Sequence, residues 1–263
     1  MTSYCSLSDL KTYLNVTAST DDNLLQVMLD AATNRIDSRC GRTFQAAADT
    51  THYFDPSRDL LRGELWFDDD LSYLTSVING DSEDVTADVY TNPRNFTPYY
   101  SLGFKSSVPN NWTYTTDIQN SISVTGRWAY MERKTITALS RSTNVVTATV
   151  AAPLLSVGMT VFVLGVADTS FNGSFTVTAN TGSTITWAQT ASNDTDTTGV
   201  LLYTPTDIAT ACRRLAAWMY RQKDTQQGDT DRPLLAGDGT VIMPTTLPQD
   251  VEKMLLPYTR FIR

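Results

Sequence analysis

The chain has little of the chemistry on which catalytic and metal sites usually depend. It holds one histidine, His52, and three cysteines, Cys5, Cys40 and Cys212, with no two at CxxC spacing. Three scattered cysteines disfavour a disulfide framework or a zinc site, so we expect reduced, buried thiols. His52 has no accompanying GxSxG or other nucleophile motif, and we expect a structural role for it.

Long apolar runs and an excess of positive charge are also missing. No stretch approaches the roughly 18 apolar residues that a membrane span needs. The first residues lack the basic and apolar regions of a signal peptide, so we expect neither a membrane segment nor export by that route. The net charge of −8 disfavours tight binding of nucleic acid, because such binding requires Lys and Arg to neutralise the phosphates. It does not exclude a surface that DNA slides past without binding.

The most acidic run, Asp68-Asp69-Asp70, does not fit a known cation site. The EF-hand template requires Gly at its sixth position and Glu at its twelfth, where this chain has Tyr73 and Asn79. A phosphate-binding loop is missing as well. We therefore expect no catalytic site, no cofactor and no metal, and we interpret the run as a solvated acidic turn.

Between Thr135 and Leu202 charge almost disappears. The only acidic or basic residues there are Arg141, Asp168, Asp194 and Asp196, and Thr, Val, Ser, Gly and Asn dominate. Such a composition shift, followed by helical sequence, predicts a β module inserted into a different host domain.

Five short strands are expected in this module, at a spacing typical of a small barrel or sandwich. Their expected ranges are Thr135–Leu139, Asn144–Val150, Met159–Leu164, Ser174–Thr178 and Ser183–Trp187. An insertion is tolerated best where its two ends lie close together, so we expect them to be adjacent.

The flanks of the module predict helices at both ends of the chain. The first follows the capping-box-like Ser6–Asp9 and runs to about Leu14. The second has the apolar stripe Leu25, Met28, Leu29, Ala32 and Ile36 and ends at Gly41. A third helix covers Thr206–Gln222 and a last one starts near Leu247. We expect the second and third helices to pack together as the host core.

Strands are predicted between Thr43 and Tyr130. Asn79-Gly80 is a strong hairpin signal after an alternating run, with Asp88–Tyr90 as its return strand. Asn92–Pro109 is rich in Pro, Asn and Tyr and predicts a long surface loop. Ser121–Tyr130 predicts a strand that is kinked or bulged at Gly126.

Two basic segments offer contact surfaces. On the third helix, three arginines lie opposite the apolar face, where they are either solvated or in contact with an acidic neighbour: Arg213, Arg214 and Arg221. The chain ends in an apolar and basic tail that either docks on a partner or packs on its own domain: Tyr258, Arg260, Phe261, Ile262 and Arg263.

The flanks resemble the head–tail adaptor (head-completion, or connector) family of long-tailed bacteriophages. The resemblance is carried by Leu7–Leu14, Asp21–Leu25, Arg35–Phe44, Ile122–Tyr130, Pro205–Ile208 with its helix through Tyr220, and Leu255–Phe261. Each motif is weak alone, but their order and spacing together are fairly specific. The segment Asp168–Val177 is similar to a small β module of assorted phage virion proteins, whereas the compact family pattern has no such insert.

The resemblance implies a structural virion protein with no active site. It implies a ring, usually of twelve subunits, between the portal protein and the tail, neck or stopper protein, assembled in the host cytoplasm. DNA would pass through the ring without specific binding. The acid-rich region Asp55–Asp81, which contains Asp68, Asp69 and Asp70, would be free for a neighbouring subunit or for the channel. An acidic lumen would repel the DNA backbone. The tail from Tyr258 would dock on the portal, and the three arginines would meet a neighbouring subunit.

The sequence therefore predicts an α+β fold, a helical adaptor core with a small β-sheet region and an inserted all-β barrel or sandwich. The expected domains are 1–132 (adaptor, first part), 133–202 (β insert) and 203–263 (adaptor, second part, with the docking tail). The alternative function is a virion or host-surface binding module whose β insert recognises glycan or protein. Exposed Trp and Tyr on the insert would favour it, but the insert holds only Trp187.

Overall fold

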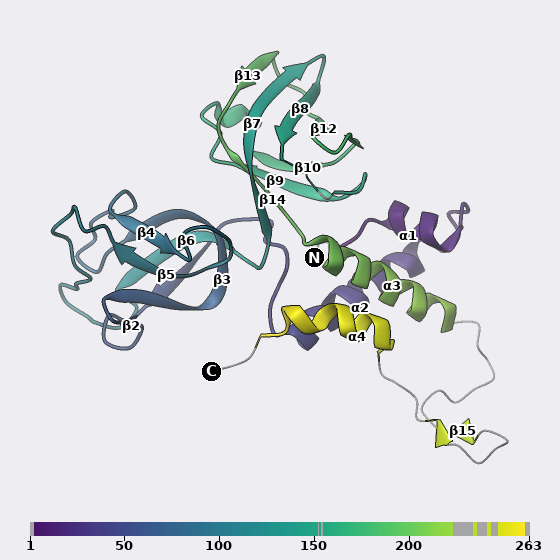
Figure 1. Ribbon diagram of the computed structural model, residues 1–263, viewed down its shortest axis with the longest axis horizontal. Helices are drawn as coiled ribbons and strands as arrows, with labels where there is room; N and C mark the ends of the chain where they lie inside the picture. The colour runs from purple at the N-terminus through teal and green to yellow at the C-terminus, as the bar shows by residue number, and fades with distance from the viewer. Residues whose placement is uncertain are drawn as a thin grey trace. The chain divides into compact units, whose positions relative to one another are not determined.

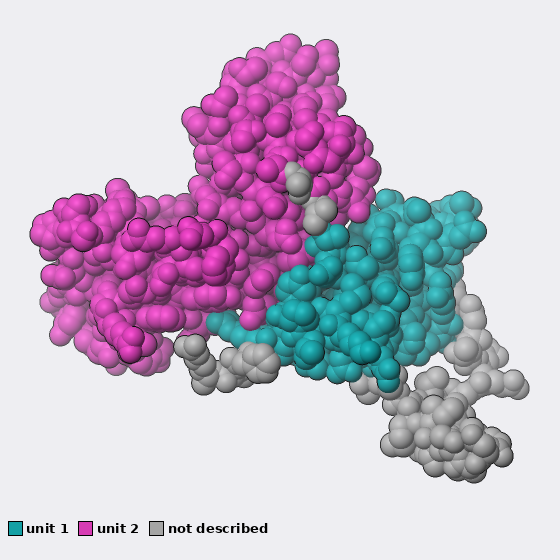
Figure 2. All heavy atoms as spheres, viewed as in Figure 1, with its two compact units in different colours: residues 1–41, 206–263 teal, residues 42–205 magenta. Residues whose placement is uncertain are grey.

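The computed structural model describes residues 3–151, 153, 155–222, 234–235, 241–242 and 247–260. The chain forms two compact units, one made of residues 1–41 and 206–263 and the other of residues 42–205 (Figure 2). The first unit is helical and the second consists of antiparallel sheets, so the fold is α+β.

The helices have the predicted positions (Figure 1). They are α1 (Leu7–Leu14), α2 (Asp22–Cys40), α3 (Thr206–Gln222) and α4 (Gln249–Leu255), which the short 3-10 helix η2 (Leu256–Tyr258) follows. Ser6 caps α1, because its side chain accepts a hydrogen bond of 3.1 Å from the backbone N–H of Asp9. Gly41 ends α2 with a φ of 64°, a left-handed conformation that suits glycine.

The packing of α2 against α3 forms the centre of the helical unit, as predicted. Leu25, Leu29 and Ile36 of α2 are fully buried, and so are Cys212 and Leu215 of α3. Full burial of such a side chain contributes roughly 1.5–3 kcal/mol. The helical unit is thus held together by residues from opposite ends of the chain.

The first sheet lies in the second unit and has the order β1-β6-β3-β5-β4, with β2 paired to β3. Its strands are β1 (Thr50–Phe54), β2 (Leu60–Leu61), β3 (Glu64–Ile78), β4 (Val89–Asn92), β5 (Tyr99–Phe104) and β6 (Ile122–Trp128). The core beside it includes Phe54, Leu65, Leu71, Leu102 and Val124.

Two predictions for this sheet are wrong. Val89–Asn92 is not the return strand of a hairpin at Asn79-Gly80, because it pairs with β5 instead of β3. Asn92–Pro109 is not a surface loop throughout, because it contains β5, whose Leu102 is fully buried between β3 and β4. The prolines around β5 suggested a loop, but they lie outside the strand and leave its backbone N–H groups free to pair.

The pairing around Gly126 is irregular, but the extra residues lie on β3 and not at Gly126, where the sequence predicted a kink or bulge. The register between β3 and β6 shifts twice, between Leu71 and Tyr73 and between Leu74 and Ser76. A Cβ atom at Gly126 would lie 2.2 Å from the backbone oxygen of Tyr73, so no other residue fits this close approach.

The second sheet has the order β10-β9-β14-β7-β8-β12-β11, with β13 paired to β7. Its strands are β7 (Glu132–Ser142), β8 (Val145–Val150), β9 (Thr160–Leu164), β10 (Gly173–Thr176), β11 (Ala179–Asn180), β12 (Thr184–Ala188), β13 (Asp194–Asp196) and β14 (Val200–Tyr203). The 3-10 helix η1 (Thr169–Phe171) lies between β9 and β10, and a further strand pair joins β15 (Leu234–Leu235) to β16 (Val241–Ile242).

The strands at the two ends of this order, β10 and β11, are consecutive in the chain and separated by two residues. The two edges of the sheet must therefore lie close together, so the sheet is strongly curled. Val177 donates its N–H to Met159 before β9, and Thr178 donates to Thr186 on β12. Across the interior, the ring of Phe175 stacks on that of Trp187 at 5.2 Å between centroids.

All five strands predicted for the charge-poor stretch are present, and β11, β13 and β14 were not predicted. The prediction that the two ends of the stretch lie together is confirmed, because Glu132 of β7 pairs with Tyr203 of β14. Tyr203 also donates its hydroxyl to the Glu132 carboxylate at 2.7 Å.

The few charges of this stretch gather around Arg141, which is only 3% exposed. Its guanidinium donates to the carbonyl of Ser192 at 2.6 Å and to the hydroxyl of Ser170 at 2.9 Å. It lies 3.9 Å from the Asp168 carboxylate and 4.2 Å from the centre of the Phe171 ring. Arg141 therefore joins strand β7 to two loops at one end of the sheet.

We expect Arg141→Ala to lower the free energy of unfolding of the second unit by about 2–4 kcal/mol, because buried hydrogen-bond acceptors lose their donor. Ser140→Ala changes an exposed residue of the same strand and should cost less than about 1 kcal/mol. Urea unfolding of both variants measures the difference. Equal losses would show that Arg141 has no special structural role.

Asp37 gives the helical unit a dependence on pH. Burial raises the pKa of this carboxyl to about 6, and the hydrogen bond from the Tyr4 hydroxyl opposes the rise. The folded state therefore holds a proton that the unfolded chain releases near its ordinary pKa of 3.8. The resulting stability is present below about pH 4 and is lost as the pH rises through about 6.

We expect the Asp37→Asn variant to gain stability relative to the natural protein between about pH 4 and pH 7, by at most about 1 kcal/mol after allowance for solvent screening. Tyr4→Phe removes the hydrogen bond that lowers the pKa of Asp37. In this variant we expect the Asp37 carboxyl to keep its proton to higher pH, so the pH-dependent loss of stability should continue to higher pH than in the natural protein. Thermal melts across this pH range test both variants. A constant difference between Asp37→Asn and the natural protein would contradict the assignment.

Candidate assembly surfaces

The interpretation of Asp68-Asp69-Asp70 as a solvated acidic turn is wrong, because all three residues lie on strand β3 and only two of them are at the surface. Asp68 and Asp69 are exposed on β3, whereas Asp70 is only 3% exposed. The Asp70 carboxylate lies 3.6 Å from the guanidinium of Arg42. The pairing of β3 with β5 shifts register between Trp66 and Leu71, so these three residues do not alternate regularly between the two faces. Burial of Asp70 removes it from the surface that a channel or a neighbour can use.

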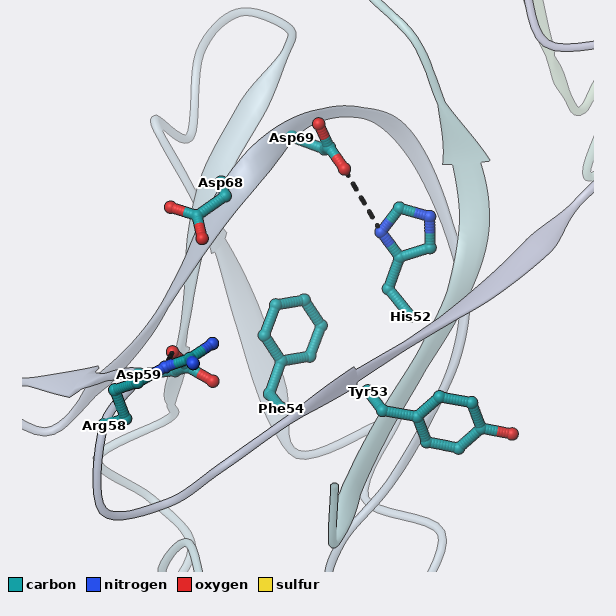
Figure 3. A pocket seen from close by; sticks show the side chains of 7 residues that line it. All are labelled: His52, Tyr53, Phe54, Arg58, Asp59, Asp68 and Asp69. Carbon is teal, nitrogen blue, oxygen red and sulfur yellow. Dashed lines mark hydrogen bonds and ion pairs between the residues drawn. The ribbon is translucent and has the colours of Figure 1, made fainter. Parts of the chain in front are cut away.

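Asp68 and Asp69 border a shallow pocket of about 220 Å³ (Figure 3). The residues that line it are His52, Tyr53, Phe54, Arg58, Asp59, Asp68 and Asp69. In Figure 3 the ring of Phe54 lies between the Arg58–Asp59 pair on one side and His52 with Asp69 on the other. The pocket thus combines an aromatic surface with a mainly acidic rim.

His52 has a packing role at this pocket. Its ring stacks on that of Trp128, with centroids 4.1 Å apart and planes parallel to within 1°. Its Nδ1 atom lies 3.5 Å from an Asp69 carboxylate oxygen. Arg58 holds Asp59 at 3.1 Å on the opposite side. These pairs orient the side chains around the pocket but leave no nucleophile beside the imidazole.

Tyr53 and Phe54 were not expected at a functional surface, and Arg58 and Asp59 were expected there only as part of the acid-rich region 55–81. They lie on β1 and the turn after it, and β1 reaches β3 only through β6, which lies between them in the sheet. No local motif signals this grouping, because it depends on a strand that comes later in the chain.

The three arginines of α3 do not form one surface. Arg213 contacts Asp9 of α1 at 3.1 Å, and Arg214 pairs with Asp250 of α4. Both therefore hold shorter helices against α3. Arg221, in the last turn of α3, is exposed.

The start of the C-terminal tail lies on its own helical unit. The Tyr258 hydroxyl donates to the Asp207 carboxylate at 3.3 Å, and the backbone N–H of Arg260 donates to the carbonyl of Cys40 at 2.7 Å. Val251 and Leu255 of α4, the helix before this segment, are buried. The remaining residues of the predicted docking tail, Phe261, Ile262 and Arg263, lie outside the described residues.

Within the part of the chain that the structure describes, no three His, Cys, Asp or Glu side chains are grouped as metal ligands would be. Over the same residues, no helix has both the length and the apolar character of a membrane span.

The start of the chain is similar to a known protein family. No curated protein matches the chain significantly. A family model does match residues 4–73, a range that contains α1, α2, β1, β2 and the first part of β3. This family model describes phage head-tail connector proteins, which are structural components of the virion at the junction of head and tail. Residues 4–73 thus carry the signature of the family described as phage gp6-like head-tail connector proteins.

Proposed function

We propose that this chain forms a homo-oligomeric ring that joins the portal vertex of a tailed-phage head to the tail or neck and lines the DNA channel. The family match over residues 4–73 carries the proposal. The helical unit supports it, since α3 completes a core that the matched helices α1 and α2 begin. The ring assembles in the host cytoplasm, and twelve copies is the number we expect.

The domain organisation that we propose has an adaptor in two parts, 1–132 and 203–263, and a β insert at 133–202. The pairing of Glu132 with Tyr203 supports an insertion, because the chain leaves and re-enters at one place. Residues 133–202 contain nearly all of strands β7 to β14, and only Glu132 and Tyr203 lie outside this range.

A ring requires two different faces that meet at each subunit boundary. We assign Arg221 to one face, since it is exposed at the end of α3. Arg213 and Arg214 act within the subunit, where they fasten α1 and α4. Their contribution to the boundary is therefore to keep α3 in place.

Asp68 and Asp69 are the residues that we assign to the channel. Both are exposed, and the chain as a whole carries a net charge of −8. Carboxylates along a channel repel the phosphates of DNA, so the genome can pass without adhering. Asp70 supports this surface from below through its contact with Arg42.

The C-terminal tail is the portal contact in this proposal. Tyr258 and Arg260 fix the base of the tail to the helical unit. Phe261 and Ile262 would bury apolar surface on the portal, and Arg263 would pair with its acidic residues.

The alternative, a binding module that recognises glycan, has less support. Its best aromatic candidate, Trp187, is fully buried and stacks on Phe175. A buried ring offers no surface on which a sugar can stack.

Electron microscopy of purified particles tests the main proposal. With an antibody or gold label on the chain, we expect the label at the single vertex that carries the tail. Label dispersed over the head or on tail fibres would overturn the connector function. Negative-stain images of the chain mixed with purified portal should show stacked rings.

Loss of the tail should prevent attachment to the portal. We expect a chain truncated after Pro257, and a Phe261→Ala/Ile262→Ala variant, to bind portal at least about tenfold more weakly, because the apolar contacts are lost. The double variant keeps the contacts of Tyr258 and Arg260, and thermal melts establish that it is folded. Normal occupancy on portal-containing heads in both variants would refute the docking role.

Reversal of charge in the channel should create DNA binding. Rings of the Asp68→Lys/Asp69→Lys variant are expected to retain DNA in filter assays at low salt, with an affinity that falls as salt rises, whereas natural rings retain none. Asp117→Lys/Asp194→Lys is the matched control, since it makes the same change of charge at two exposed acids that lie outside β3. Equal binding by the control would show that total charge matters and position does not.

A further inference from the structure

The residues before α1 are fastened across the helical unit. Ser3 donates its hydroxyl to Asp30 at 3.0 Å, and the backbone N–H of Tyr4 donates to the Thr33 hydroxyl at 3.4 Å. The Tyr4 side chain is 5% exposed and reaches Asp37. All three acceptors belong to α2, so this N-terminal segment follows the long helix closely.

Two cysteines meet where this segment crosses α3. Cys5 lies on the segment and Cys212 on α3, and both are buried. The backbone N–H of Tyr4 and the sulfur of Cys212 share the Thr33 hydroxyl, from which the Cys212 sulfur lies 3.6 Å away. This places Cys5, the residue after Tyr4, beside Cys212, and each thiol shifts the pKa of the other. The arrangement brings two sulfur atoms together without joining them.

The two thiols are chemically unequal. Contacts with the Cys5 thiol and the Thr33 hydroxyl lower the pKa of Cys212 against the effect of burial. The contact with Cys212 and burial both raise the pKa of Cys5. A thiolate is the nucleophilic form of cysteine, so Cys212 is the attacking group and Cys5 is the thiol that responds to it.

We propose that Cys5 and Cys212 are an oxidative modification site, at which a peroxide converts the pair into an intramolecular disulfide. The Cys212 thiolate attacks one oxygen of hydrogen peroxide, the O–O bond breaks, and a sulfenic acid and hydroxide result. The Cys5 sulfur then attacks the Cys212 sulfur, the S–S bond forms, and the sulfenic oxygen leaves as water once protonated. Two thiols and one peroxide give one disulfide and two waters.

The bond would tie the N-terminal segment to α3 and close a loop that contains the whole β unit. A cross-link over so long a loop restricts the unfolded chain strongly and should stabilise the helical unit. Peroxide reaches the buried sulfur atoms when the short N-terminal segment opens locally, so the reaction should be slow. The inference concerns the isolated chain and does not depend on the proposed ring.

Cys40 provides an internal comparison. It is also buried, but it lies seven residues beyond Thr33 on α2, which corresponds to about 10 Å along the helix axis. It is therefore too far from Cys212 for a disulfide, whose Cα atoms lie at most about 7 Å apart.

The experiment treats the folded, full-length natural protein with hydrogen peroxide, blocks remaining thiols, and maps the peptides without reduction. We expect a Cys5–Cys212 cross-linked peptide, and a rise in Tm on the order of 5–10 °C that dithiothreitol reverses. Cys40→Ser should retain both effects. Cys5→Ser and Cys212→Ser should lose both.

Three results would overturn the proposal. One is a cross-link that includes Cys40, another is a cross-link between two chains only, and the third is oxidation of Cys212 to a sulfinic acid without any link to Cys5. Because the peptide map of the natural protein decides among these, the outcome stands even if a serine variant folds poorly. A particle that lacks the chain at its vertex would refute the connector function and leave this result unchanged.

Discussion

The packing of α2 on α3 is the contact on which the helical unit depends. These helices are separated by the entire β unit, yet Thr33 and Cys212 approach to 3.6 Å in the buried seam between them. The smaller elements are fastened to this pair by polar contacts, α1 through Asp9 and Arg213 and α4 through Asp250 and Arg214. Apolar burial thus supplies the core, and ion pairs at its edge place the short helices.

The charge-poor stretch, residues 135–202, is also held by contacts between residues that are distant in the chain. The stretch starts and ends in paired strands, at Glu132 and Tyr203, so its ends impose little strain on the residues around them. The stretch has few charged residues, and three of them lie close together. Arg141 is opposite Asp194 in the β7–β13 pairing and lies near the carboxylate of Asp168. The scarcity of charge that marks this stretch in the sequence corresponds in the structure to one buried arginine and its partners.

Helix positions could be predicted well because their signals are local. A Ser6 cap, an apolar stripe on α2 and a glycine at position 41 each act within a few residues. Strand pairing was harder, because it depends on partners distant in the chain. β5 was missed between prolines, and β4 was given the wrong partner, since nothing near either strand indicates that they pair with each other.

The sequence by itself determined the α+β class, the helices, the strand-rich character of residues 135–202 and the resemblance to phage connectors, because composition and periodicity are properties of neighbouring residues. Only the tertiary structure decided which charged residues remain at the surface. It buried Asp70 against Arg42, paired Arg213 and Arg214 within the subunit, and brought Cys5 to Cys212. The physical reason is that burial and pairing depend on distance in space, which a run of adjacent residues does not specify.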